Sequence, residues 1–171
     1  MLVLVCGLPG TGKSTVAERI VELLPARLLR TDVVRKELFP EPTYEAEESA
    51  AVYDELLDRA RDLLDAGEDV VLDATFRRQE LRDRAAGVAD DADTEFRLVR
   101  VECAEAVVKE RIERRQREED DESDADFSVY NQLKTEFEPI ERETHVVVDN
   151  SGSLAATLSA VDEAFRAAAA A

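Results

Sequence analysis

Residues 2–14 read LVLVCGLPGTGKS, and this stretch decides the fold. Its first part, Leu2 to Cys6, is a continuous apolar run, which is typical of a strand buried on both faces of a parallel sheet. A glycine-rich turn follows, and apolar residues then recur at helical spacing from Lys13 to Leu24, until Pro25 ends the helix. A buried strand that turns directly into a helix predicts an α/β fold with ligands at the carboxyl ends of its strands.

The turn matches the pattern G-x-x-x-x-G-K-[ST], in the strand-to-helix context that this pattern requires. Its glycines let backbone N–H groups face phosphate oxygens, and the start of the helix adds partial positive charge. Lys13 would neutralise phosphate oxygens, and Ser14 would offer its hydroxyl to Mg²⁺. We therefore expect ATP and Mg²⁺ as cofactors, with the nucleotide held by Gly7, Pro9, Gly10, Thr11, Gly12, Lys13, Ser14 and Thr15.

The rest of the chain alternates between strand and helix patterns. Further strands are expected at residues 27–30, 70–72, 96–101 and 146–148, and further helices at 43–66, 79–90, 104–118, 127–137 and 153–168. This alternation predicts a parallel sheet covered by helices on both faces. The length of 171 residues favours a single domain, residues 1–171.

Two carboxylates follow predicted strands. Asp32 comes after the second strand, where it can accept the proton of an attacking hydroxyl, and Arg35 lies one helical turn further on, where it would hold an acceptor or the leaving phosphate. Alternatively, Asp32 is a helix N-cap and Arg35 its surface partner. Asp73 ends the third strand and would reach the metal through water, or else act as a cap.

Three arginines, Arg111, Arg114 and Arg115, lie three and four residues apart on one predicted helix, and an acidic loop from Glu118 to Asp126 follows. Phosphoryl transfer needs cations on the departing charge, so we expect a lid at about residues 110–130. In it, Arg111 and Arg114 would contact ATP and Arg115 would be catalytic. Because glutamates are interleaved with these arginines, an exposed helix laced with ion pairs is the alternative.

The charge balance is strongly acidic, with 40 Asp and Glu against 22 Lys and Arg and a net charge of −18. The carboxylates are spread over every predicted helix, so the acidity belongs to the folded surface. We interpret it as a sign of a halophilic host, whose salt screens the repulsion among surface carboxylates. The same charge makes a nucleic-acid partner unfavourable without excluding it.

Two further patterns concern location and the thiols. Apolar stretches are shorter than the roughly 20 residues that cross a bilayer, and the apolar N-terminal run has no basic flank, so we expect a cytoplasmic protein without a membrane partner. Cys6 and Cys103 lie in apolar segments and are interpreted as buried small hydrophobic residues. Asn150 begins a loop after the last strand, where an adenine would find room.

The segments GLPGTGKST, RTDVVR, VVLDAT, ERIERRQR and ESDADFSVYNQ occur in this order. In this the chain resembles the P-loop kinases that group AAA_33 proteins with zeta toxins, gluconate kinase, chloramphenicol phosphotransferase and polynucleotide 5′-kinase, from Leu2 to about Asn150. The resemblance implies a P-loop NTPase fold of three layers, α/β/α, with five parallel strands in the order 2-3-1-4-5 and a small helical lid. It also implies Asp32 as the base, arginines of the lid between Arg111 and Arg115, and an acceptor pocket walled by residues 43–66.

We therefore expect an ATP-dependent phosphotransferase that moves the γ-phosphoryl group of ATP to a hydroxyl of a small-molecule acceptor. Polynucleotide 5′-kinase-like activity is one alternative, and a nucleotide-binding switch or slow ATPase without an acceptor is another. The sequence identifies neither the acceptor, nor a preference for ATP over GTP, nor the oligomeric state.

Overall fold

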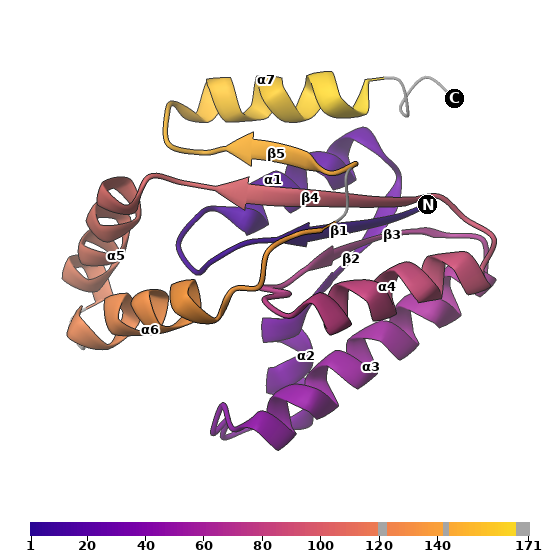
Figure 1. Ribbon diagram of the computed structural model, residues 1–171, viewed down its shortest axis with the longest axis horizontal. Helices are drawn as coiled ribbons and strands as arrows, with labels where there is room; N and C mark the ends of the chain where they lie inside the picture. The colour runs from indigo at the N-terminus through magenta and orange to yellow at the C-terminus, as the bar shows by residue number, and fades with distance from the viewer. Residues whose placement is uncertain (120–122, 142–143, 167–171) are drawn as a thin grey trace.

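The computed structural model describes residues 1–119, 123–141 and 144–166 of the chain. In this part the chain forms five strands that alternate with seven helices (Figure 1). Their bounds are β1 Leu2–Cys6, α1 Lys13–Leu23, β2 Ala26–Arg30, α2 Thr31–Leu38, α3 Ala46–Asp65, β3 Asp69–Asp73, α4 Gln79–Asp91, β4 Phe96–Glu102, α5 Glu105–Glu119, α6 Ser123–Glu136, β5 Val146–Asp149 and α7 Leu154–Phe165.

The strands form one parallel sheet in the order β2-β3-β1-β4-β5, which confirms the predicted topology. β1 is central, and Leu4 lies opposite Leu72 of β3 and Leu98 of β4. All five residues of β1 are buried, as its unbroken apolar sequence requires. Because every strand runs the same way, all the carboxyl ends meet at one edge of the sheet (Figure 1).

Helices cover both faces of the sheet, so the fold is a three-layer α/β/α arrangement. Leu2 and Leu4 point to the face covered by α3 and α4, while Val3 and Val5 point to the face covered by α1 and α7. A smaller cluster, which includes Val108, joins α5 to α6. In Figure 1 these two helices lie beyond the carboxyl ends of the strands, where the phosphate-binding turn also emerges.

Arg82 of α4 is a buried cation, with 2% of its surface exposed. Its guanidinium donates hydrogen bonds to the carbonyl oxygens of Phe76 (2.7 Å), Glu138 (3.0 Å) and Pro139 (2.8 Å), and to the side chain of Gln79 (2.7 Å). Burial lowers the pKa of Arg82. Arg82 therefore ties the segment that follows α6 to the connection between β3 and α4.

The start of α3 differs from the prediction of a helix over residues 43–66. The helix begins at Ala46, because the Glu48 carboxylate accepts hydrogen bonds from the backbone N–H groups of Thr43 (2.7 Å) and Tyr44 (3.2 Å). Tyr44 adopts a left-handed φ of 60°. These residues therefore form a non-helical connection, held by the Glu48 side chain, that the helical periodicity does not reveal.

The predicted acidic loop from Glu118 to Asp126 is mostly helical. α5 continues to Glu119 and α6 begins at Ser123, while residues 120–122 lie outside the described part of the chain. The end of the predicted last helix, at residue 168, also lies outside it, and α7 is described to Phe165. Helix α2 was not among the predicted helices, and it follows β2 without a break.

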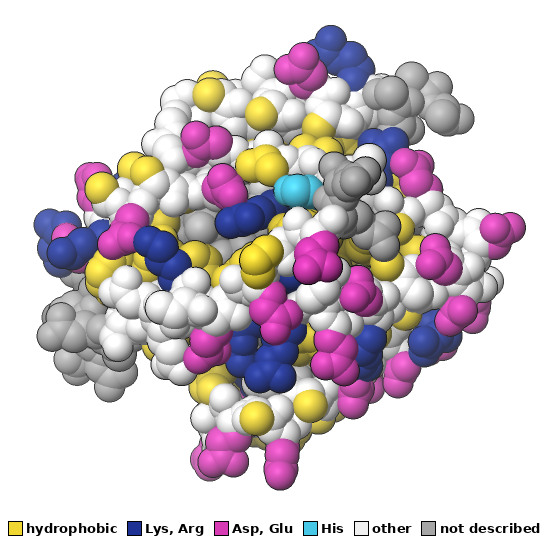
Figure 2. Space-filling view, in the orientation of Figure 1, with side chains coloured by type: hydrophobic (Ala, Val, Ile, Leu, Met, Phe, Trp, Pro, Cys, Tyr) yellow, Lys and Arg dark blue, Asp and Glu magenta, His cyan; other side chains and the backbone are white. Residues whose placement is uncertain are grey.

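Acidic side chains are spread over the face shown in Figure 2 and do not form one patch. Cys6 and Cys103 are both free thiols. Cys6 is buried, which raises its pKa to about 11, whereas Cys103 is only half-buried, contrary to the prediction. None of the helices in the described ranges combines the length and apolar character that crossing a membrane would need.

Candidate functional site

The turn between β1 and α1, residues 7–14, is shaped by its main chain. Gly10 and Gly12 have left-handed φ values of 77° and 90°. A Cβ atom on Gly12 would lie 2.0 Å from the Asn150 side-chain nitrogen, so this position accepts only glycine. The buried Thr11 hydroxyl donates to the Leu8 carbonyl at 2.8 Å and fixes the curl of the turn.

Lys13 folds back over this turn. Its ammonium donates to the carbonyl oxygen of Leu8 at 3.0 Å. Burial lowers the pKa of Lys13, and the carboxylates of Asp73 and Asp32 oppose this effect. The ammonium therefore lies among backbone groups and carboxylates, and phosphate oxygens bound there would further favour its charged form.

Ser14 and Asp73 lie together although 59 residues separate them in the chain. The Ser14 hydroxyl donates to Oδ2 of Asp73 at 2.8 Å, and the helix that follows β3 has Arg78 rather than Asp73 at its N-cap. Burial raises the pKa of Asp73, and the hydrogen bond from Ser14 and the charges of Lys13 and Arg30 lower it. No group of three or more His, Cys, Asp or Glu side chains suited to a metal exists among the described residues. One hydroxyl and one carboxylate fit Mg²⁺, which takes few protein ligands beside water and phosphate oxygens.

Asp32 is the second residue of α2 and is exposed. Arg30 occupies the N-cap position of α2, so the alternative role of Asp32 as a cap is wrong. Arg30, at the end of β2, lies opposite Asp73 in the sheet, so Asp32, two residues further on, stands at the same carboxyl edge, and its negative charge raises the pKa of both Lys13 and Asp73.

Arg35 forms a buried ion pair with Glu48 of α3, and their side chains are 10% and 6% exposed. Its guanidinium also contacts Ser49 at 3.3 Å and lies over the ring of Tyr44. Burial opposes ionisation of Glu48, but hydrogen bonds from Thr43 and Arg35 bring its pKa down to about 2. The alternative of Arg35 as a partner of Asp32 is thus wrong, and an acceptor contact would require this ion pair to open.

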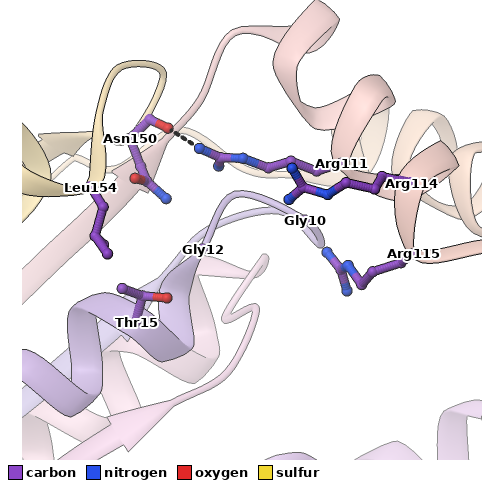
Figure 3. A pocket seen from close by; sticks show the side chains of 8 residues that line it. All are labelled: Gly10, Gly12, Thr15, Arg111, Arg114, Arg115, Asn150 and Leu154. Carbon is purple, nitrogen blue, oxygen red and sulfur yellow. Dashed lines mark hydrogen bonds between the residues drawn. The ribbon is translucent and has the colours of Figure 1, made fainter. Parts of the chain in front are cut away.

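A cavity of about 290 Å³ lies between α5, the phosphate-binding turn and the start of α7 (Figure 3). It brings together the three predicted arginines of α5 with residues of the turn. Its lining consists of Gly10, Gly12, Thr15, Arg111, Arg114, Arg115, Asn150 and Leu154. Arg111 donates to the carbonyl oxygen of Asn150 at 2.7 Å, and Figure 3 shows its side chain reaching along the upper rim.

Asn150 braces the turn from the far side of the cavity. Its side-chain nitrogen donates to the carbonyl of Thr11 at 2.8 Å, and its side-chain oxygen accepts from the Thr157 hydroxyl at 2.7 Å. The sequence pointed to this loop only as room for an adenine and missed the bracing role. The available signal was the position of Asn150 directly after the last strand, at the edge where ligands bind.

Proteins of two mycobacteria resemble part of the chain. Uncharacterized proteins of Mycobacterium tuberculosis and Mycobacterium bovis are 39% identical to the chain over 118 residues, which is 62% of this chain and 23% of those proteins. The chain thus corresponds to less than a quarter of the length of these relatives.

Solved structures resemble the whole fold. A gluconokinase from Sinorhizobium meliloti is 21% identical, with a TM-score of 0.74, over 98% of this chain and 93% of the gluconokinase. Kti12 from Chaetomium thermophilum, in complex with ADP-AlF3, is also 21% identical, with a TM-score of 0.73, over 98% of both chains. At such identities the likeness shows the fold alone, which the chain shares with both proteins. The family AAA_33, described as an AAA domain, matches residues 2–140 of the chain. The chain, whose phosphate-binding turn follows the central strand of the sheet, therefore belongs to that family.

Proposed function

We propose that this chain is an ATP-dependent phosphotransferase that transfers the γ-phosphoryl group of ATP to a hydroxyl of a small-molecule acceptor. The observation that carries the proposal is the meeting of Lys13, Ser14, Asp73 and Asp32 at one edge of the sheet. Three of these groups serve phosphate and metal. The fourth, Asp32, is an exposed carboxylate beside them, which a nucleotide-binding site alone would not need.

The residues of the turn would hold the nucleotide. Backbone N–H groups of Gly10 to Lys13 and the Lys13 ammonium would bind phosphate oxygens, and Ser14 and Asp73 would hold Mg²⁺. When bound, the metal supplies positive charge to the β- and γ-phosphates. Thr15 and the exposed Leu154 line the cavity on the side where the nucleoside would extend.

Asp32 would act as the general base. A carboxylate near the transferred phosphoryl group can accept the proton of the attacking hydroxyl, which contributes about 10²- to 10⁴-fold in rate. Arg114 and Arg115, which line the cavity from α5, would stabilise charge on the departing phosphate as part of a lid formed by α5 and α6. We assign Arg35 to holding α2 against α3, given its buried pair with Glu48.

The likeness to a gluconokinase supports a small hydroxyl compound as the acceptor, and the Kti12 complex with ADP-AlF3 supports nucleotide binding. A surface with a net charge of −18 favours a small molecule over a polynucleotide, because binding phosphates along a strand requires basic surface. We propose a cytoplasmic location, since ATP and Mg²⁺ are available there.

The test is ADP release with Mg²⁺ across a panel of sugars, sugar acids, nucleosides and 5′-hydroxyl oligonucleotides, for wild type and Asp32→Ala. We expect one small-molecule class to stimulate turnover, and Asp32→Ala to lower that turnover about 10²-fold or more with nucleotide affinity unchanged. The matched control is Asp91→Ala, which removes an exposed carboxylate at the end of α4. Slow hydrolysis that needs no acceptor and is the same in Asp32→Ala would instead indicate a nucleotide switch.

A further inference from the structure

Arg30 is the last residue of β2 and points toward the candidate metal site. Its terminal nitrogen Nη2 is paired with Glu18 of α1, and its Nε lies 3.7 Å from Oδ2 of Asp73. That distance is too long for a hydrogen bond. Within the described ranges, Nε of Arg30 is the single buried side-chain nitrogen or oxygen atom that has no hydrogen-bond partner.

A buried donor without an acceptor is unfavourable, and such groups in folded proteins are rare enough to need an explanation. The acceptor within reach of Nε is the Asp73 carboxylate, which is 6% exposed and already accepts from Ser14 on the same oxygen. Both contacts therefore fall on Oδ2. Neither residue engages Oδ1.

We propose that Arg30 is a positioning residue for the candidate metal site: its Nε would close onto Oδ2 of Asp73 and hold this carboxylate in the orientation in which it would serve Mg²⁺. The proposal rests on the proposed nucleotide and Mg²⁺ site. It assigns Arg30 a role that neither the motif nor the fold requires.

The surroundings of Arg30 favour positioning over competition with the cation. A guanidinium near a metal site repels the metal unless its charge is balanced, and Glu18 supplies the balancing carboxylate. Glu18 and Ser14 both belong to α1, so Arg30 and Asp73 join the ends of β2 and β3 to the helix that carries the phosphate-binding turn. Asp73 is thereby held from two sides.

The experiment measures the affinity of a fluorescent ATP analogue as Mg²⁺ is titrated, beginning in EDTA, for wild type and Arg30→Gln. We expect unchanged affinity in EDTA, and a half-maximal Mg²⁺ concentration that is about tenfold higher in the variant, as is usual when a residue that orients a metal ligand is removed. The matched control is Arg27→Gln, on the same strand, whose side chain is 65% exposed and lies 3.8 Å from Glu68. It should titrate like wild type.

Arg30→Lys separates position from charge, because lysine keeps the positive charge but has no Nε. The positioning role predicts that this variant also requires about tenfold more Mg²⁺. Wild-type behaviour of Arg30→Lys, or a lower Mg²⁺ requirement in Arg30→Gln, would overturn the proposal and leave the phosphotransferase function intact. Absence of analogue binding by the wild type, with or without Mg²⁺, would instead overturn both.

Discussion

The phosphate-binding turn and the connection between α2 and α3 are held in different ways. The turn is shaped by left-handed glycines and by side chains that bond to main-chain carbonyls, as Asn150 does to Thr11. The α2–α3 connection is held by charges, through the buried pair of Arg35 and Glu48. Main-chain geometry restricts the residue types at fixed positions, whereas an ion pair can join any two positions that the fold brings together. The first region is therefore readable in the sequence and the second is not.

Gly12→Ala has the largest expected effect and tests whether main-chain geometry shapes the phosphate-binding turn. The new methyl group would meet the side chain of Asn150 at a left-handed φ, so we expect a loss of about 1–3 kcal/mol in the free energy of unfolding and no measurable nucleotide binding. Thermal unfolding and binding of a fluorescent ATP analogue measure the two effects. Gly87→Ala is the control, because this glycine of α4 has open space around its Cβ position and alanine favours the helix. Normal binding by Gly12→Ala would show that Asn150 does not constrain the turn.

Glu48→Gln addresses the charged region. It leaves Arg35 buried without its anion, so we expect the Tm at pH 7 to fall by roughly 5 °C. The folded-state pKa of Glu48, about 2, lies below its ordinary value of 4.5. The pair therefore stabilises the fold fully above pH 4.5, and this stabilisation is lost as the pH falls through 2.

The measurement for this second prediction is Tm against pH for wild type and Glu48→Gln. The two curves should converge as the pH approaches 2. Glu47→Gln serves as the control, since Glu47 is the exposed neighbour in the first turn of α3 and should leave Tm nearly unchanged. A constant difference between wild type and Glu48→Gln at all pH values would mean that the pair is not what stabilises this connection.

Salt gives the smallest expected effect and sharpens the contrast between exposed and buried charge. The chain has 40 acidic and 22 basic residues, so its charged surface repels itself. Raising KCl from 0.1 M to about 1 M shortens the screening length from about 10 Å to 3 Å and should therefore raise Tm by a few degrees. Glu48→Gln should gain as much as wild type, because the buried pair is screened little. A Tm that is flat or falls with KCl would make the halophilic interpretation wrong.

The sequence predicted the sheet well because the strands are short segments rich in apolar residues that end at a glycine or a polar residue. β1 begins and ends where it was expected, and the strand order followed from the family resemblance. Ser14 and Asp73 were each expected at the metal, and they meet because β1, which leads into the turn before Ser14, pairs with β3, which ends at Asp73. By contrast, nothing in the spacing of Arg35 and Glu48, or of Arg30 and Glu18, indicates that they meet. Side-chain partners across elements depend on packing, which periodicity does not specify.

The buried Arg82 also has a mechanical consequence. Its guanidinium holds the carbonyls of Glu138 and Pro139 against α4. If α5 and α6 rotated as a unit, the chain from Glu138 onward would therefore stay in place. At the other end, the backbone N–H of Ala104 is hydrogen-bonded to Ser151 at 2.8 Å. The pivots of such a rotation are thereby confined to the chain just after Ala104 and just before Glu138.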